Sequence, residues 1–167
     1  MPLSYTRERK MSSWNTVLAT FWCCPKDDDP CYGKPAWNLD DVFGKECILP
    51  DHACDEDGFW THSEEDDKAY EKALSKYRET YRDARAHPED YLPMGSEGSC
   101  EKTFRKVGTH SWIVTVFGSL RDREPENFRE VKEWFERCLG KCYVRCAVCR
   151  VSNGWSGKSE VYQYEDY

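Results

Sequence analysis

The last third of the chain alternates strand-like and helix-like segments, and this order limits the fold more than any other feature. Residues 111–117 (SWIVTVF) are β-branched and aromatic, as is typical of a buried strand. Segment 125–140 repeats apolar residues at helical spacing between a proline suited to a first turn and a final glycine. Two further strand-like runs follow, at 142–151 and 159–164. We therefore expect a strand–helix–strand–strand (β-α-β-β) unit over 108–167, with its helix packed on one face of the sheet.

The N-terminal region contains one segment with helical spacing. Trp14, Val17, Leu18 and Phe21 recur at the intervals that give a helix one apolar face, and two serines precede them as candidate caps. The sequence therefore predicts a short helix that ends near Cys24.

A long polar helix is predicted in the middle of the chain. Ser63 followed by Asp66 is a capping arrangement, and His87 before a proline ends the helical pattern. Its narrow apolar stripe consists of Tyr70, Leu74, Tyr77, Tyr81 and Ala84. We expect a helix over 63–87 that packs along the domain surface, with a partner-binding helix or a short coiled coil as the alternative.

Length and composition favour one domain. A chain of 167 residues with 39% hydrophobic residues can bury a sizeable core, and no long linker divides it. We expect a single α+β domain over 1–167: a loop-rich, Cys- and aromatic-rich region at 1–62, the polar helix at 63–87, and the β-α-β-β unit at 108–167.

The loop-rich region predicts a structural zinc site. Prolines and glycines interrupt residues 25–60, and such a segment gains folding free energy when a metal ion ties it together. Thiolate and imidazole groups are the ligands that a tetrahedral Zn²⁺ prefers. The candidate ligands are Cys31, Cys47, His52, Cys54 and His62. Their spacing is not that of a common zinc knuckle, so separate thiols are the alternative.

A second group of cysteines, Cys138, Cys142, Cys146 and Cys149, lies near the C-terminus. In a regular strand, residues 142 and 146 point to one face and residue 149 to the other. We therefore expect Cys142 and Cys146 to share a buried apolar face, and the group to serve mainly as small buried hydrophobic residues, with a metal site as the alternative.

The charge distribution leaves two kinds of partner open. The net charge of −7 argues against strong nonspecific nucleic-acid binding, since phosphate neutralisation drives that binding. Residues 102–158, however, carry 12 Lys/Arg against 6 Asp/Glu. An RNA-binding alternative would use the basic C-terminal sheet. Its candidate contacts are Arg121, Arg123, Tyr143, Arg145, Arg150 and Trp155.

The common catalytic motifs are missing from the sequence. It contains no phosphate-binding loop, dinucleotide fingerprint, nucleophile elbow or HExxH motif. A thiol-dependent, papain-like hydrolase is the remaining catalytic alternative, with Cys23, Cys24 or Cys100 as nucleophile and His110 as base. We assign no catalytic residue and expect a protein that is not an enzyme.

The aromatic content favours recognition of another macromolecule. Seven Trp and ten Tyr supply the side chains that dominate interface hot spots. The candidate partner-binding residues are Trp37, Phe59, Trp60, Tyr70, Tyr77 and Tyr81. We expect an intracellular regulatory or antagonist factor, cytoplasmic or nuclear and of the kind represented by small viral accessory proteins. It should bind a protein, without a membrane or a small-molecule substrate.

Overall fold

The computed structural model describes residues 13–26, 38–121 and 126–166. The strands are β1 (Trp14–Pro25), β2 (Cys100–Val107), β3 (Ser111–Arg121), β4 (Cys142–Asn153) and β5 (Ser159–Glu165). The α-helices are α1 (Leu39–Phe43), α2 (Glu64–Ala86) and α3 (Glu126–Lys141), and a 3-10 turn, η1, spans Pro88–Asp90. The chain is thus of the α+β class, as the sequence predicts.

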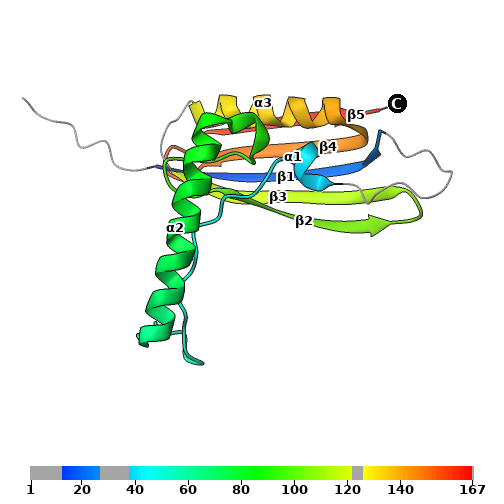
Figure 1. The fold of residues 1–167 in the computed structure, drawn as a ribbon. Helices are drawn as coiled ribbons and strands as arrows, with labels where there is room; N and C mark the ends of the chain where they lie inside the picture. Colours follow the sequence, from blue (N-terminus) through cyan, green and yellow to red (C-terminus); the bar gives the residue numbers. More distant parts are fainter. Residues whose placement is uncertain (1–12, 27–37, 122–125, 167) are drawn as a thin grey trace, which may run out of the picture.

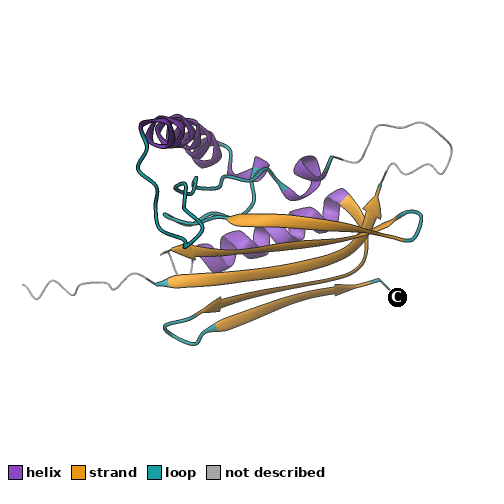
Figure 2. Cartoon of the chain, turned by 90° about the horizontal axis from the view of Figure 1, so that it is seen from below, coloured by secondary structure: helices purple, strands orange, loops and turns teal. Residues whose placement is uncertain are grey.

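The five strands form one sheet in the order β2-β3-β1-β4-β5. Every neighbouring pair is antiparallel, so β3 and β4 run in the same direction on either side of β1. The α3 helix connects β3 to β4 and lies against one face of the sheet (Figures 1 and 2). The β-α-β-β order of elements is present, and β1 separates its first two strands.

The predicted helix near the N-terminus is wrong, because this segment is the central strand β1. Buried and outward-facing residues alternate along it, with Asn15, Val17, Ala19, Phe21 and Cys23 buried on the α3 side. The outward positions include Trp14, Leu18 and Trp22. Because both faces of β1 carry large apolar side chains, some apolar residues of this strand also fall at the three- and four-residue spacing of a helix.

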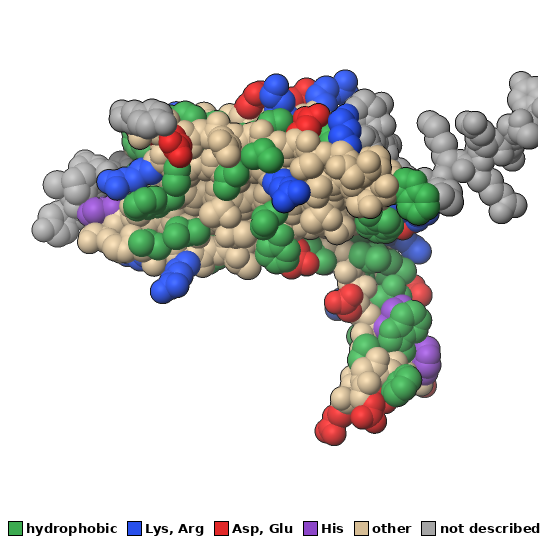
Figure 3. All heavy atoms as spheres, turned by 180° about the vertical axis from the view of Figure 1, so that it is seen from behind, with side chains coloured by type: hydrophobic (Ala, Val, Ile, Leu, Met, Phe, Trp, Pro, Cys, Tyr) green, Lys and Arg blue, Asp and Glu red, His purple; other side chains and the backbone are tan. Residues whose placement is uncertain are grey.

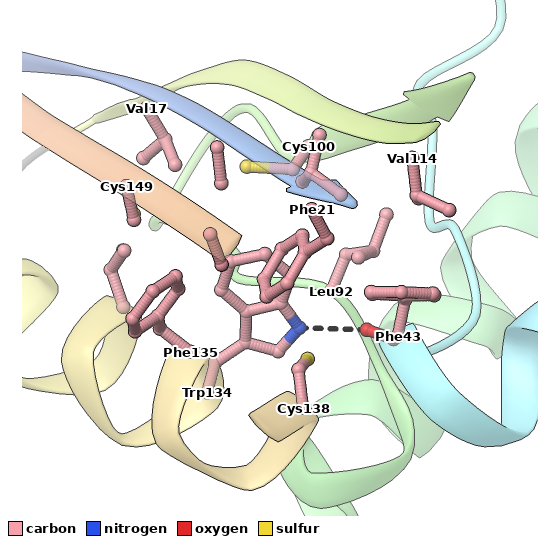
Figure 4. Close-up of a cluster of buried hydrophobic side chains, with 14 of the residues drawn as sticks. Val17, Phe21, Phe43, Leu92, Cys100, Val114, Trp134, Phe135, Cys138 and Cys149 are labelled. Carbon is pink, nitrogen blue, oxygen red and sulfur yellow. Dashed lines mark hydrogen bonds between the residues drawn. The ribbon is translucent and has the colours of Figure 1, made fainter. Parts of the chain in front are cut away.

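The core lies between the sheet and the helices α1 and α3. Phe21 is fully buried, and its ring centroid is 5.1 Å from that of Phe43, 5.8 Å from that of Trp134 and 5.3 Å from that of Phe135 (Figure 4). Trp134 Nε1 also donates a 2.7 Å hydrogen bond to the carbonyl oxygen of Phe43. These contacts fasten both helices to the central strand.

The predicted long helix and its cap are confirmed in α2. The Ser63 side chain accepts a 3.0 Å hydrogen bond from the backbone N–H of Asp66, and His87 caps the C-terminus. The C-terminal half of α2 packs through Tyr77, Tyr81 and Ala84 onto a small buried cluster of Cys47, Tyr91 and Met94. The N-terminal half of α2 and the loop alongside it, which together we name the arm, project away from the sheet (Figure 1). No helix among residues 13–26, 38–121 and 126–166 is long and apolar enough to cross a lipid bilayer.

The predicted orientation of the C-terminal cysteines is wrong at Cys146 and Cys149, because Cys149 and not Cys146 shares the buried face with Cys142. The register between β1 and β4 shifts between Trp22 and Cys23, so that β4 carries one extra residue there. Such a bulge reverses the alternation beyond it. Cys142 and Cys149 are consequently both buried on the α3 side, whereas Cys146 is exposed on the other face. Cys138 is buried as expected.

Candidate functional site

The projecting end of α2 and the loop before it carry a concentrated negative charge. Residues 51–68, which we name the acidic tip, contain eight Asp/Glu and one Lys. Their net charge of −7 equals that of the whole chain, so all other residues together are neutral. Acidic side chains gather at the end of the projecting arm (Figure 3). The potential of the molecule is therefore most negative at this point.

Two large aromatic side chains are exposed on the acidic tip. Phe59 is 72% exposed and Trp60 is 61% exposed. A tight turn holds them, because Asp55 Oδ1 accepts hydrogen bonds from the backbone N–H groups of Asp57 at 3.0 Å and Phe59 at 2.9 Å. The backbone N–H of Asp55 donates in turn to the carbonyl oxygen of Phe59 at 2.9 Å. Gly58 has φ of +83°, a conformation that other residues rarely adopt.

An aromatic stack fastens this turn to α2. The His52 ring lies between Trp60 and Tyr70, with centroid distances of 4.3 Å and 3.7 Å. At the start of the helix, the Ser63 hydroxyl donates a 2.6 Å hydrogen bond to Asp66 Oδ2, and Thr61 Oγ1 lies 3.0 Å from the same oxygen. These hydrogen bonds from Ser63 and Thr61 lower the pKa of Asp66. The acidic tip is thus an ordered structure.

The six predicted partner-binding residues have different environments. Phe59 and Trp60 are exposed on the acidic tip, and Trp60 and Tyr70 both stack on His52. Tyr77 and Tyr81 are half-buried and attach α2 to the rest of the chain. Trp37 lies outside the described residues.

The candidate zinc ligands within the described ranges lie in different environments. Cys47 is buried beneath α2, and burial raises the pKa of its thiol. His52 is in the aromatic stack, while the exposed Cys54 directs its thiol toward the carbonyl oxygen of His52, at 3.5 Å. His62 is exposed, with Nδ1 3.9 Å from Asp67. Within the described ranges no three His, Cys, Asp or Glu residues form a group that could hold a metal ion. Cys31 lies outside those ranges, and the zinc site stays a prediction.

The structure places Cys100, one candidate nucleophile of the predicted thiol hydrolase, far from the candidate base His110. Cys100 is buried at the start of β2, where burial raises the pKa of its thiol. His110 lies in the turn after the far end of β2, roughly 24 Å along the strand. The Cys23 thiol donates a hydrogen bond to Cys142, which raises the pKa of Cys23 and lowers that of Cys142. Because Cys23 pairs with Trp112, the next residue, Cys24, lies close to this turn, one residue before the end of β1. Under the hydrolase alternative, Cys24 is therefore the remaining candidate nucleophile, with His110 as the candidate base.

Three of the six candidate RNA contacts lie on one strand. Tyr143, Arg145 and Arg150 project from β4 on the face opposite α3, and the Arg145 guanidinium lies 5.2 Å from the Trp22 ring centroid. The other three candidates have separate accounts. Arg121 forms an ion pair with Glu97, Trp155 lies in the turn after β4, and Arg123 is outside the described residues.

The sequence analysis missed the face of the sheet opposite α3, which we name the open face. No helix of the described chain covers it (Figure 2), and hydrophobic side chains lie across it with basic residues among them (Figure 3). Its exposed hydrophobic residues are Trp14, Leu18, Trp22, Ile113, Phe117, Tyr143, Val148 and Val161. The sequence signal for this face was the alternation of inward and outward positions along residues 14–24. It was obscured because the outward positions are also apolar.

Comparisons with known proteins give no relative. No protein family model matches the chain, and neither the curated proteins nor the solved structures include a match. The function is therefore argued from the geometry of the chain itself.

Proposed function

We propose that this protein is a regulatory factor, and not an enzyme, that acts by binding a basic protein surface through its acidic tip. The observation that carries the proposal is the exposure of Phe59 and Trp60 at the most negative point of the molecule. Large aromatic anchors with a polar rim around them are typical of protein interfaces.

The charge of the acidic tip favours a protein over a nucleic acid. Eight carboxylates around the exposed aromatic rings would repel phosphate groups, whereas they would attract lysine and arginine side chains. The complementary partner presents an apolar pocket for Trp60 or Phe59, with basic residues at its rim. Electrostatic attraction of this kind mainly accelerates association and weakens as salt screens it.

The order within the acidic tip supports the same conclusion. The hydrogen bonds of Asp55 hold the backbone of Phe59, and the stacking of His52 holds the Trp60 ring, before any partner arrives. Binding then loses less conformational entropy than it would with a flexible loop. Because the arm projects from the sheet, it can reach a recessed surface on a partner that the flat sheet of this protein cannot enter.

The test compares three immobilised proteins in nuclease-treated cell lysate: the unaltered chain, the Phe59→Ala/Trp60→Ala variant, and Trp155→Ala. Trp155 is a matched control, because it is 73% exposed in the turn after β4 and outside the acidic tip. We expect proteins that the unaltered chain and the control retain, and that the double variant loses. With a purified partner, the double variant should bind at least about 30-fold more weakly, since a hot spot contributes about 2 kcal/mol or more.

Two results would contradict this proposal. Equal retention of the same proteins by the double variant would exclude the acidic tip as the binding site. Recovery of RNA alone from untreated lysate, with loss upon Arg145→Glu and Arg150→Glu, would favour the RNA-binding alternative instead.

A further inference from the structure

The open face is unusually apolar for the outer side of a sheet that has a helix on its other side. Such a face is normally polar, because the strands alternate between core and solvent. Here Leu18 is 51% exposed and Val161 is 52% exposed, and Leu18 stands directly opposite Phe117 on β3. Contiguous apolar surface of this kind marks an interaction site.

The strand registers arrange the open face in rows that cross the whole sheet. One row, which we name the Trp22 row, contains Arg105, Ile113, Trp22, Cys146 and Glu165. The next row contains Thr103, Thr115, Thr20, Val148 and Gln163. The third, the Leu18 row, contains Glu101, Phe117, Leu18, Arg150 and Val161. Each row has its middle residue on β1, with two strands on either side.

The charges at the ends of these rows make the open face complementary to the open face of a second copy. The Trp22 row has a positive charge at its β2 end, Arg105, and a negative charge at its β5 end, Glu165. A twofold axis parallel to β1 would reverse each row onto itself, because such an axis exchanges the two edges of the sheet. Arg105 would then face Glu165 of the second copy, and Trp22 would face its own equivalent.

We propose that the open face is a dimer interface, in which two copies of the chain pack their sheets face to face about a twofold axis parallel to β1. In the Leu18 row the same operation brings Arg150 over Phe117 of the second copy and next to its Glu101. Packed sheets cross at about 30°, which displaces the row ends by roughly 5 Å. Arginine and glutamate side chains span that distance.

The dimensions of the open face fit a stable dimer. Five strands at about 4.8 Å spacing and about eight residues at 3.4 Å per residue give roughly 650 Å². Standard interfaces bury about 800 Å² on each partner, with a lower limit near 600 Å². A hollow of about 340 Å³ beside Trp22, Val148 and Gln163 lies where Ile113 of the second copy would arrive. The interface therefore has both the area and a recess for an apolar side chain.

A second copy explains the charges better than a nucleic acid does. Together with Arg145, which lies over the Trp22 ring, the Trp22 and Leu18 rows contain three arginines and two glutamates. For a phosphate backbone, Glu101 and Glu165 would be repulsive, whereas in the twofold dimer both are opposite or beside arginine. None of these residues belongs to the acidic tip, so the dimer and the proposed function are independent.

The test is sedimentation equilibrium on the full-length chain and a charge-exchange series, from about 1 to 100 μM. We expect a dimer for the unaltered chain. Arg105→Glu and Glu165→Arg should each raise the dimer dissociation constant by at least about tenfold, because each places like charges together. The combined variant should return it to within about threefold of the original value. Leu18→Glu should give a monomer, since two glutamates would then meet at the axis.

The controls separate assembly from folding. Circular dichroism and thermal melting of each variant show whether the monomer still folds, and Trp155→Glu changes an exposed residue outside the rows. A monomer at all concentrations, or failure of the combined variant to recover, would overturn the proposal. A monomer that binds single-stranded RNA oligonucleotides and loses them upon Arg150→Glu would assign the open face to RNA.

Discussion

Replacing Phe21 with alanine should remove a large part of the free energy of unfolding. Phe21 is fully buried at the centre of β1, and its ring contacts Phe43, Trp134 and Phe135. Truncation removes roughly 140 Å² of buried apolar surface, which is worth about 3.5 kcal/mol at 25 cal/mol per Å². The lost ring contacts and the remaining cavity raise this to about 4 kcal/mol, a large share of the total for a small domain.

Phe104→Ala is the matched control for this substitution. Phe104 is on β2 and 59% exposed, so the same truncation removes less than half as much buried surface and should cost about 1 to 1.5 kcal/mol. Urea unfolding followed by tryptophan fluorescence measures both free energies, provided that the slope with urea is unchanged. If Phe21→Ala does not fold, Phe21→Leu should still lose about 1 to 2 kcal/mol. Equal losses for Phe21→Ala and Phe104→Ala would refute the placement of the core.

Two further predictions concern hydrogen-bonded groups. The Tyr91 hydroxyl donates a 2.6 Å hydrogen bond to Asp83, which together with burial raises the pKa of Tyr91 to about 12. This hydrogen bond stabilises the fold fully below pH 10, the ordinary pKa of tyrosine, and the stabilisation is lost as the pH rises toward 12. Ultraviolet titration of the Asp83→Asn variant should show Tyr91 ionising at lower pH. An unchanged titration would contradict this prediction. Asn153 is buried, donates a 2.8 Å hydrogen bond to Asn15 and accepts two from backbone N–H groups of the following turn. Asn153→Ala should cost about 2 to 3 kcal/mol in urea unfolding, and a loss under about 0.5 kcal/mol would show that these bonds do not order the turn.

Local signals in the sequence were sufficient for α2 and insufficient for β1. The start of α2 depends on Ser63 and Asp66, and its end on His87 and the proline that follows. All four residues act within one turn of the helix. β1 depends instead on strands more than 80 residues away.

The errors at β1 and at Cys146 have distinct physical causes. In β1, outward residues such as Leu18 and Trp22 are as apolar as the buried ones, so the period of two was hidden by a coincidental helical spacing. At Cys146, a bulge opposite Trp22 and Cys23 shifts the alternation by one residue. A bulge is set by the pairing of two strands and leaves no mark in the sequence of either.

The candidate site shows the same division between local and distant determinants. Phe59 and Trp60 were named because they are aromatic residues in a loop-rich segment, and both are exposed, since loops run along the surface. The rows of the open face could not be identified, since they require the registers of all five strands. Only the assembled sheet brings Arg105 and Glu165 into one row with Trp22.

The central position of β1 also has a consequence for synthesis on the ribosome. β1 emerges first among the strands, yet its two neighbours, β3 and β4, start at residues 111 and 142. The nascent chain must therefore expose a strand that is apolar on both faces until β3 and β4 have been made. Contacts so distant in sequence slow folding, and unpaired apolar strands promote aggregation. We expect newly made chains to depend on chaperones until β4 has left the exit tunnel.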